Sequence, residues 1–347
     1  MFPILLLLVL TVVSARYPLT TNPVPPSSTN SSSIVWTFRR LIDIDLSPFS
    51  RETFDHLNAT DTTPSSDLRN ASKSVVVVTT ASLPWMTGTA VNPLLRASYL
   101  AKKRSATAGV CTLAVPFIDD LPTQRKLYKN ATFSNKREQE SYLRNWLDSC
   151  GEYSSPDSLR IVFYPAVYDP FLKSIFPLGD VPSLLNNSSS VDKNTICILE
   201  EPEHLNWYRA PGPSWREKFA YVVGICHTNY KAYASAYGVV TGVTTGTAIA
   251  QMSALTSRAH CDRIILLSEA LPNFASERTI VCNVHGVREE FFREEGDIAA
   301  VDEDKSEMIY FIGKLLWAKG LDLMLELQTS FRKIKYVALA VNWHRVV

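Results

Sequence analysis

Short apolar runs alternate with longer polar or amphipathic segments from residue 74 onward. Runs of β-branched and aliphatic residues of this length are typical of strands buried on both faces of a parallel sheet. A helix is predicted from Asn92-Pro93 to Ala101, since proline favours the first helical position, and another over 138–147. This alternation predicts an α/β fold with a doubly wound sheet. The predicted strands are 74–80, 109–116, 159–164, 195–199, 221–226, 260–268, 278–287 and 308–313.

The residues before 74 follow a different pattern. Residues 2–13 form a leucine-rich run that ends at Ser14-Ala15. The run has the length of a signal-peptide core and is too short to span a bilayer comfortably. Residues 16–73 are rich in Ser, Thr, Asn and Pro, a composition that predicts disorder. Six Asn-X-Ser/Thr sequons permit glycosylation on a secretory route, although four lie in tracts where composition alone produces them. They are Asn30, Asn58, Asn70, Asn130, Asn186 and Asn187.

Composition narrows the class of protein. The chain has 347 residues, is 46% hydrophobic and carries a net charge of +1, which predicts two domains and no nucleic-acid partner. Its six cysteines are widely spaced, and Cys197, Cys226 and Cys282 fall in predicted strands, which favours buried thiols over a disulfide framework. No Cys-X-X-Cys or His-X-X-X-His spacing indicates a metal site.

Polar side chains follow two predicted strands at the point where each ends. Glu200, Glu201 and His204 follow one apolar run, and His227 follows the next. Open α/β sheets bind ligands at the carboxyl ends of their strands, so these residues predict a site; solvated loop residues are the alternative. Adjacent residues on an extended segment point in opposite directions, so the two carboxylates are not expected to face one bond.

Two loops are further candidates. Thr87, Gly88 and Thr89 precede the first predicted helix, where free backbone N–H groups attract phosphate; an ordinary tight turn is the alternative. The proline-rich segment 164–185 carries Phe171 and Phe176 beside a lysine, which suits a membrane interface or an apolar acceptor groove. The alternative is that this segment packs on its own domain.

Five motifs together carry a family resemblance. In chain order they are 79–101, 200–208, 223–230, 281–287 and 311–320. They resemble the digalactosyldiacylglycerol synthase family, within the family 4 retaining glycosyltransferases, and the resemblance covers about 74–327. It implies a GT-B fold, in which two Rossmann-like domains face one another across a cleft.

The resemblance implies transfer of galactose from UDP-galactose to monogalactosyldiacylglycerol at a membrane surface, with retention of configuration and no further cofactor. Fixed cations and N–H groups would stabilise the charge on the departing UDP. The implied residues are Glu201, His204 and His227 for catalysis; Thr87, Gly88, Thr89, Lys314 and Lys319 for the donor; and Trp85, Trp207, Phe171 and Phe176 for the acceptor or membrane.

The predicted organisation is a leader (1–15), a disordered segment (16–73), an acceptor-side Rossmann-like domain (74–287), a linker (288–307) and a partial donor-side domain (308–347). The resemblance fades after Leu327 and the family's acidic donor motif has no counterpart, so a truncated enzyme with weak donor binding is expected. The alternatives are a family 4 enzyme with another donor or lipid acceptor, and an inactive lipid-binding protein. The expected location is the plastid envelope, reached through a signal peptide, or else the secretory route.

Overall fold

The computed structural model describes 66–282, apart from residues 105, 130, 151–156, 171–172, 189–191, 208–211, 236–238 and 274, together with 308–313, 321–330 and 335–340. The predicted leader, most of the predicted disordered segment and the predicted linker lie outside the described residues. So do Phe171, Lys314 and Lys319.

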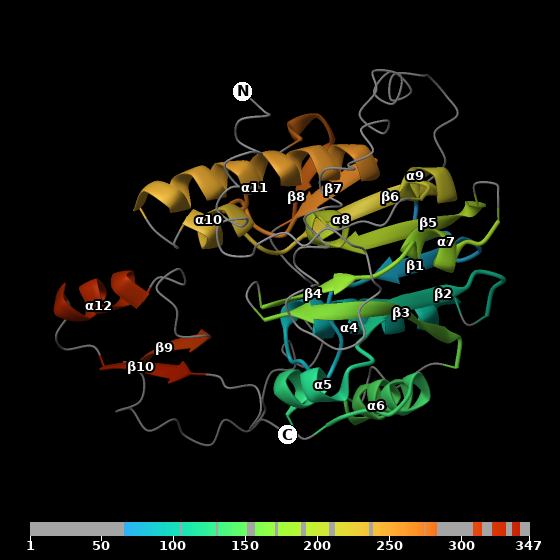
Figure 1. Cartoon of the computed structure of the whole chain (residues 1–347), viewed down its shortest axis with the longest axis horizontal. Coiled ribbons are helices and arrows are strands. Elements are labelled where there is room, and N and C mark those ends of the chain that lie inside the picture. The colour runs from blue at the N-terminus through green and yellow to red at the C-terminus, as the bar shows by residue number, and fades with distance from the viewer. Residues whose placement is uncertain are drawn as a thin grey trace, which may run out of the picture.

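The described chain is built on an eight-stranded sheet in the order β4-β3-β2-β1-β5-β6-β7-β8 (Figure 1). Neighbouring strands are parallel except β3 and β4, which form an antiparallel pair at one edge. This confirms the α/β prediction with a mostly parallel sheet, while the two-domain GT-B arrangement stays a prediction. The strands are β1 (Ser74–Val78), β2 (Cys111–Phe117), β3 (Leu159–Asp169), β4 (Ser174–Pro177), β5 (Asp192–Glu200), β6 (Phe219–Cys226), β7 (Arg263–Leu266) and β8 (Thr279–Val281).

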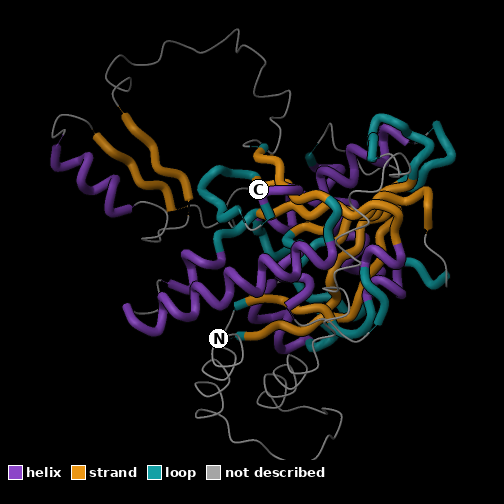
Figure 2. The backbone as a smooth tube through the Cα atoms, turned by 90° about the horizontal axis from the view of Figure 1, so that it is seen from above, coloured by secondary structure: helices purple, strands orange, loops and turns teal. Residues whose placement is uncertain are grey.

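Helices connect these strands, with α5 and α6 beyond the β3 side of the sheet and α10 and α11 toward the β7 side in Figure 1. They are α4 (Gly88–Arg104), α5 (Leu121–Tyr128), α6 (Lys136–Ser149), α7 (Val181–Leu185), α8 (Pro202–Trp207), α9 (Trp215–Lys218), α10 (Tyr230–Ser235) and α11 (Val239–His260). A short 3₁₀ helix, η4 (Ser276–Arg278), precedes β8. A separate two-stranded parallel sheet of β9 (Met308–Gly313) and β10 (Lys335–Ala340) accompanies α12 (Leu321–Ser330) (Figures 1 and 2).

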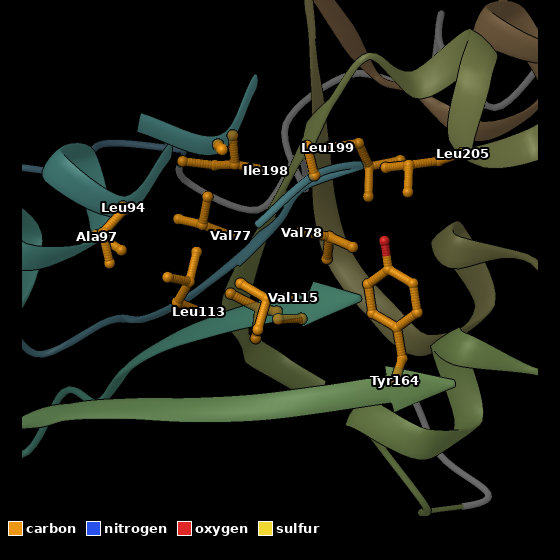
Figure 3. Close-up of a cluster of buried hydrophobic side chains, with 14 of the residues drawn as sticks. Val77, Val78, Leu94, Ala97, Leu113, Val115, Tyr164, Ile198, Leu199 and Leu205 are labelled. Atoms are coloured by element: carbon orange, nitrogen blue, oxygen red, sulfur yellow. The ribbon is translucent and has the colours of Figure 1, made fainter. Parts of the chain in front are cut away.

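The core is centred on β1, which has a parallel neighbour on each side. Val75, Val77 and Val78 are fully buried, because both faces of this strand are covered. Figure 3 shows Val77 and Val78 among side chains of β2, β5 and α4, and Tyr164 reaching in from β3. The Tyr164 hydroxyl donates to the Thr79 carbonyl at 2.6 Å, so even this buried polar group has a partner.

Helix α4 begins earlier than predicted. It starts at Gly88, and Pro93 lies inside the helix instead of opening it. A proline has no N–H to donate to the carbonyl four residues earlier, which here belongs to Thr89. The Thr79 hydroxyl, at the end of β1, donates to the Thr89 carbonyl instead. A side chain from the neighbouring strand end therefore supplies the missing donor.

Thr79→Val is expected to lower the free energy of unfolding by about 1–2 kcal/mol, because it leaves the Thr89 carbonyl without this donor. Valine keeps the shape of the side chain and the backbone bonds of β1. Denaturant unfolding followed by circular dichroism measures the change. Thr112→Val is the matched control, since this β2 hydroxyl makes no hydrogen bond within the described part of the chain. Equal unfolding midpoints for the two variants would contradict the idea that the Thr79 hydroxyl replaces the missing donor of Pro93.

Other segments also differ from the prediction. The polar stretch after β2 contains α5, which Asp120 caps by accepting from the Thr123 amide at 2.9 Å. The proline-rich segment is not a single loop, since β3 continues to Asp169 and pairs with β4 before α7. Residues 239–260, for which no element was predicted, form α11.

The cysteine prediction is confirmed for two of the three named thiols. Cys197 and Cys226 are buried, whereas Cys282 is exposed because it follows β8, the edge strand of the sheet. None of the six cysteines, all of which are described, forms a disulfide.

Candidate functional site

The strand order reverses between β1 and β5. The chain passes from β1 outward to β2 and β3, then returns to β5 on the other side of β1. Doubly wound sheets bind ligands at the carboxyl edge beside such a reversal. Glu200 ends β5 and Glu201 follows it, while Thr80 and Thr228 follow β1 and β6 at the same edge. The sheet therefore gathers these polar residues at its binding edge.

Glu201 makes a sharp turn between β5 and α8. Its φ of 59° lies in the left-handed region, which a residue with a side chain adopts only at a cost of order 1 kcal/mol. Its amide donates to the Ile225 carbonyl at 2.8 Å, and its carbonyl accepts from the Leu205 amide at 3.0 Å. Both bonds hold the turn, and the side chain is 3% exposed.

The Glu201 carboxylate is surrounded by donors. Thr228 Oγ1 donates to Oε1 at 2.5 Å, and Tyr230 Oη donates to Oε2 at 2.6 Å. Thr80 Oγ1 and His204 Nδ1 lie 3.3 and 3.4 Å from Oε2. Burial raises the pKa of this carboxyl, but the His204 hydrogen bond and charge, followed by the His227 charge and the Thr228 hydrogen bond, lower it to about 2.

An ionised carboxylate with these partners organises its neighbours. Protein donors already occupy its oxygens. A nucleophile would instead present a free oxygen to the sugar carbon. Glu201 can accept from His204 only if Nδ1 carries a proton. The geometry therefore supports a positioning role for Glu201.

His204 lies among aromatic rings. Its ring centroid is 5.0 Å from that of Phe176 and 5.2 Å from that of Trp207, and the Tyr230 hydroxyl lies 3.1 Å from Nδ1. Its Nε2 is buried and has no hydrogen-bond partner in the described part of the chain. The imidazole is thus held firmly on one side and has an unused nitrogen on the other.

Glu200 turns to a different set of partners. It is fully buried, accepts from His227 Nε2 at 2.5 Å and forms an ion pair with Arg96 of α4. Burial lowers the pKa of His227 to about 4, with Glu201 opposing and Arg96 adding to the shift. Glu200 and Glu201 therefore make their hydrogen bonds to different side chains.

The sequence is similar to curated plant proteins. The chain is 39% identical over 265 residues to digalactosyldiacylglycerol synthase 1 of Arabidopsis thaliana. It is 37% identical to synthase 2 of Glycine max and 35% identical to synthase 2 of Arabidopsis thaliana. The chain is a homologue of plant digalactosyldiacylglycerol synthases. No protein-family model matches it.

The homologous region covers 75% of this chain but only part of each synthase. It spans 31% of the Arabidopsis synthase 1 and 54% of the Glycine max synthase 2. All of these synthases are chloroplastic by name. Among the helices of the described residues, none combines the length and apolar character needed to cross a membrane.

Of the other predicted residues that the structure describes, Trp85 and Thr87 to Thr89 follow β1, Phe176 lies on β4 and Trp207 ends α8. Trp85 packs edge-on against Tyr168, with ring centroids 6.2 Å apart. Phe176 is 4% exposed and Ile175 is 1% exposed, so β4 packs on its own domain, as the alternative prediction had it. Phe176 still touches the site, through His204.

The Thr87-Gly88-Thr89 segment forms the start of α4. The two threonine hydroxyls lie 3.1 Å apart, and Gly88 is exposed. A Cβ at Gly88 would meet only an ordinary contact, 3.5 Å from Asn92 Nδ2. The protein's own packing therefore does not demand glycine here.

Five residues of the cluster were not predicted from the sequence: Thr80, Arg96, Glu203, Thr228 and Tyr230. Arg96 lay inside an apolar helix, where a single arginine with no partner nearby in sequence was the available signal. Thr228 and Tyr230 follow His227 directly in the polar run. Glu203 lies within the polar run after β5 and was assigned no role, but it is 1% exposed and accepts from Cys226 Sγ at 3.4 Å. No group of three or more His, Cys, Asp or Glu side chains suited to a metal occurs within the described ranges.

Proposed function

We propose that this chain forms the acceptor-side part of an enzyme that transfers galactose from UDP-galactose to monogalactosyldiacylglycerol. The observation that carries the proposal is the cluster of Glu200, Glu201, His204 and His227 at the strand reversal. Its support is homology to synthases whose names state digalactosyldiacylglycerol as the product.

His227 is the group proposed to contact the reacting sugar. It follows β6 at the ligand-binding edge, and burial keeps its ring neutral at physiological pH. A neutral imidazole can accept a hydrogen bond from a sugar hydroxyl and move a proton. His204, with its buried and unpartnered Nε2, is proposed as a second polar contact on the acceptor side.

The departing UDP requires positive groups around its phosphates. The start of α4 at Gly88 is proposed to receive a diphosphate oxygen, since the first N–H groups of a helix have no intrahelical acceptor. Lys314 and Lys319, implied by the family resemblance, are proposed to complete this contact. Charge that grows on the leaving group would be stabilised by fixed donors and cations.

The acceptor lipid requires an apolar approach. Trp85, Trp207 and Phe171 are proposed to line it or to meet the membrane surface, and peripheral association with the plastid envelope is proposed on the chloroplastic names of the homologues. Trp207 touches His204, which links the proposed acceptor groove to the polar cluster, and the buried Phe176 packs on the same ring.

The assay uses a chimaera in which residues 74–287 replace the homologous segment of the Arabidopsis thaliana synthase 2. Radiolabelled UDP-galactose and vesicles with monogalactosyldiacylglycerol are supplied, and digalactosyldiacylglycerol is identified by mass spectrometry. We expect this product. If a folded chimaera galactosylates a different lipid instead, that lipid replaces monogalactosyldiacylglycerol as the proposed acceptor.

His227→Ala in the same chimaera is expected to reduce turnover by about 10²-fold or more, which is the scale of a lost acid–base or polar contact. The fold should persist, because Glu200, which accepts from His227, keeps its ion pair with Arg96. His260→Ala, at a buried histidine that pairs with Ser214 away from the cluster, is the control for loss of a histidine as such. Turnover at the rate of the unsubstituted chimaera would contradict a role for His227 in the site.

A further inference from the structure

We infer that Arg96 and Glu200 are positioning residues that hold His227 as the neutral tautomer protonated on Nε2. The inference deepens the proposed function and rests on it for its catalytic meaning. It concerns three residues from separate elements: Arg96 in α4, Glu200 at the end of β5 and His227 just after β6. Helix α4 packs on β1 and β2, and β1 lies beside β5 in the sheet (Figure 1).

The two oxygens of Glu200 contact different partners. Oε2 lies 2.5 Å from His227 Nε2, and Oε1 is paired with Arg96 Nη1. The carboxylate is fully buried, and the side chain of Arg96 is 22% exposed. A buried carboxylate requires such partners, because an unpaired charge in the interior is strongly unfavourable.

The arrangement selects one tautomer of the histidine. An ionised carboxylate has no proton to donate, so the nitrogen that faces it must carry one. The proton of a neutral His227 therefore lies on Nε2, and the lone pair lies on Nδ1. A ring in this state accepts a hydrogen bond or proton at Nδ1, which is the form that a sugar hydroxyl requires of a base.

Burial lowers the pKa of His227, and the charge of Arg96 lowers it further. Alone, the charge of Glu200 would favour a second proton on His227, and so does the charge of Glu201 nearby. Arg96 balances Glu200 and repels a proton from the ring. Glu200, Glu201 and Arg96 are the charged groups placed around this imidazole by β5 and α4.

Opposite effects are therefore expected from the two partners. Arg96→Met removes the positive charge and should raise the titration midpoint of His227 by about 1–3 pH units. Glu200→Gln removes the negative charge, leaves Arg96 in place and should lower the midpoint further. Arg96→Lys keeps the charge and should leave His227 neutral at pH 7.

The test is ¹⁵N–¹H correlation spectroscopy of the full chain labelled at its histidines, with His227→Gln used to assign the signals. The unsubstituted chain should show the Nε2–H neutral pattern at pH 7. Arg144→Met, which breaks a surface pair with Glu140, is the control and should not move the His227 signals. If Arg96→Met does not fold, the downward shift in Glu200→Gln decides the matter. An Nδ1–H pattern, an imidazolium in the unsubstituted chain, or midpoints that move the same way in both variants would overturn the inference.

This readout separates the inference from the proposed function, because the spectrum does not depend on turnover. In the chimaera, Arg96→Met should also move the acid limb of the pH–rate profile to higher pH, whereas simple structural damage would lower the rate at every pH. The expected tautomer in a chimaera without transferase activity would contradict the proposed function alone. Transfer with the other tautomer would contradict the inference alone.

Discussion

Glu201→Ala is expected to lower the free energy of unfolding by about 3–5 kcal/mol, the range found when one partner of a buried ionic group is removed. The loss is large because four donors lose their acceptor together: Thr80, His204, Thr228 and Tyr230. Alanine also keeps a Cβ at the left-handed backbone position, so it relieves none of the strain there.

Denaturant unfolding at pH 7 measures this loss, and the partly exposed Glu140 supplies the control. Glu140→Ala breaks a surface pair with Arg144 four residues on and should change stability by less than about 0.5 kcal/mol. Because the pKa of Glu201 is lowered to about 2, its contribution is present above its ordinary value of 4.5 and is lost as the pH falls toward 2. The two variants should therefore converge at low pH. A Glu201→Ala protein as stable as Glu140→Ala at pH 7 would contradict the four-donor arrangement.

Glu203→Gln is expected to become more stable than the unsubstituted protein as the pH rises from 5 to 8. Burial, followed by the charge of Glu201, raises the pKa of Glu203 to about 8. Between 4.5 and 8 the folded state then binds a proton that the unfolded state has lost. The free energy of unfolding consequently falls with pH by up to about 1.4 kcal/mol per unit from this group.

Glutamine has nearly the shape of the protonated carboxyl and does not titrate. The difference in stability between Glu203→Gln and the unsubstituted chain should therefore grow by roughly 3–4 kcal/mol over this range. Unfolding curves at pH 5, 6, 7 and 8 measure it. Glu140→Gln serves as the control for removal of an exposed carboxylate. Parallel curves for the Glu203 variant and the unsubstituted chain would show that Glu203 is already ionised in the folded protein.

Much of the sheet was predictable because a strand buried on both faces leaves a local signal. Val75 to Val78 have no polar alternation, and the structure covers both faces of β1. The opposite holds for α11, where threonine, valine and glycine are weak helix formers. Packing against α8 and α10 forms that helix, so its sequence alone gave little indication of it.

The candidate site divides in the same way. The apolar runs place Glu200, Glu201 and His227 after central strands, and the parallel order of those strands brings them to one edge. Their sequence positions do not say that Arg96 faces Glu200 or that Tyr230 faces Glu201. Those partners come from α4 and α10, across sequence separations that local patterns do not describe.

The sequence by itself thus determined the buried strands, the α/β class and the edge of the sheet where polar side chains gather. The tertiary structure decided the partners and the protonation state of each of those side chains. Glu201 and Glu203 are two residues apart, yet one has a pKa of about 2 and the other of about 8. Burial favours the neutral acid in both, and the hydrogen bond and charge of His204, followed by His227 and Thr228 after β6, reverse this only for Glu201.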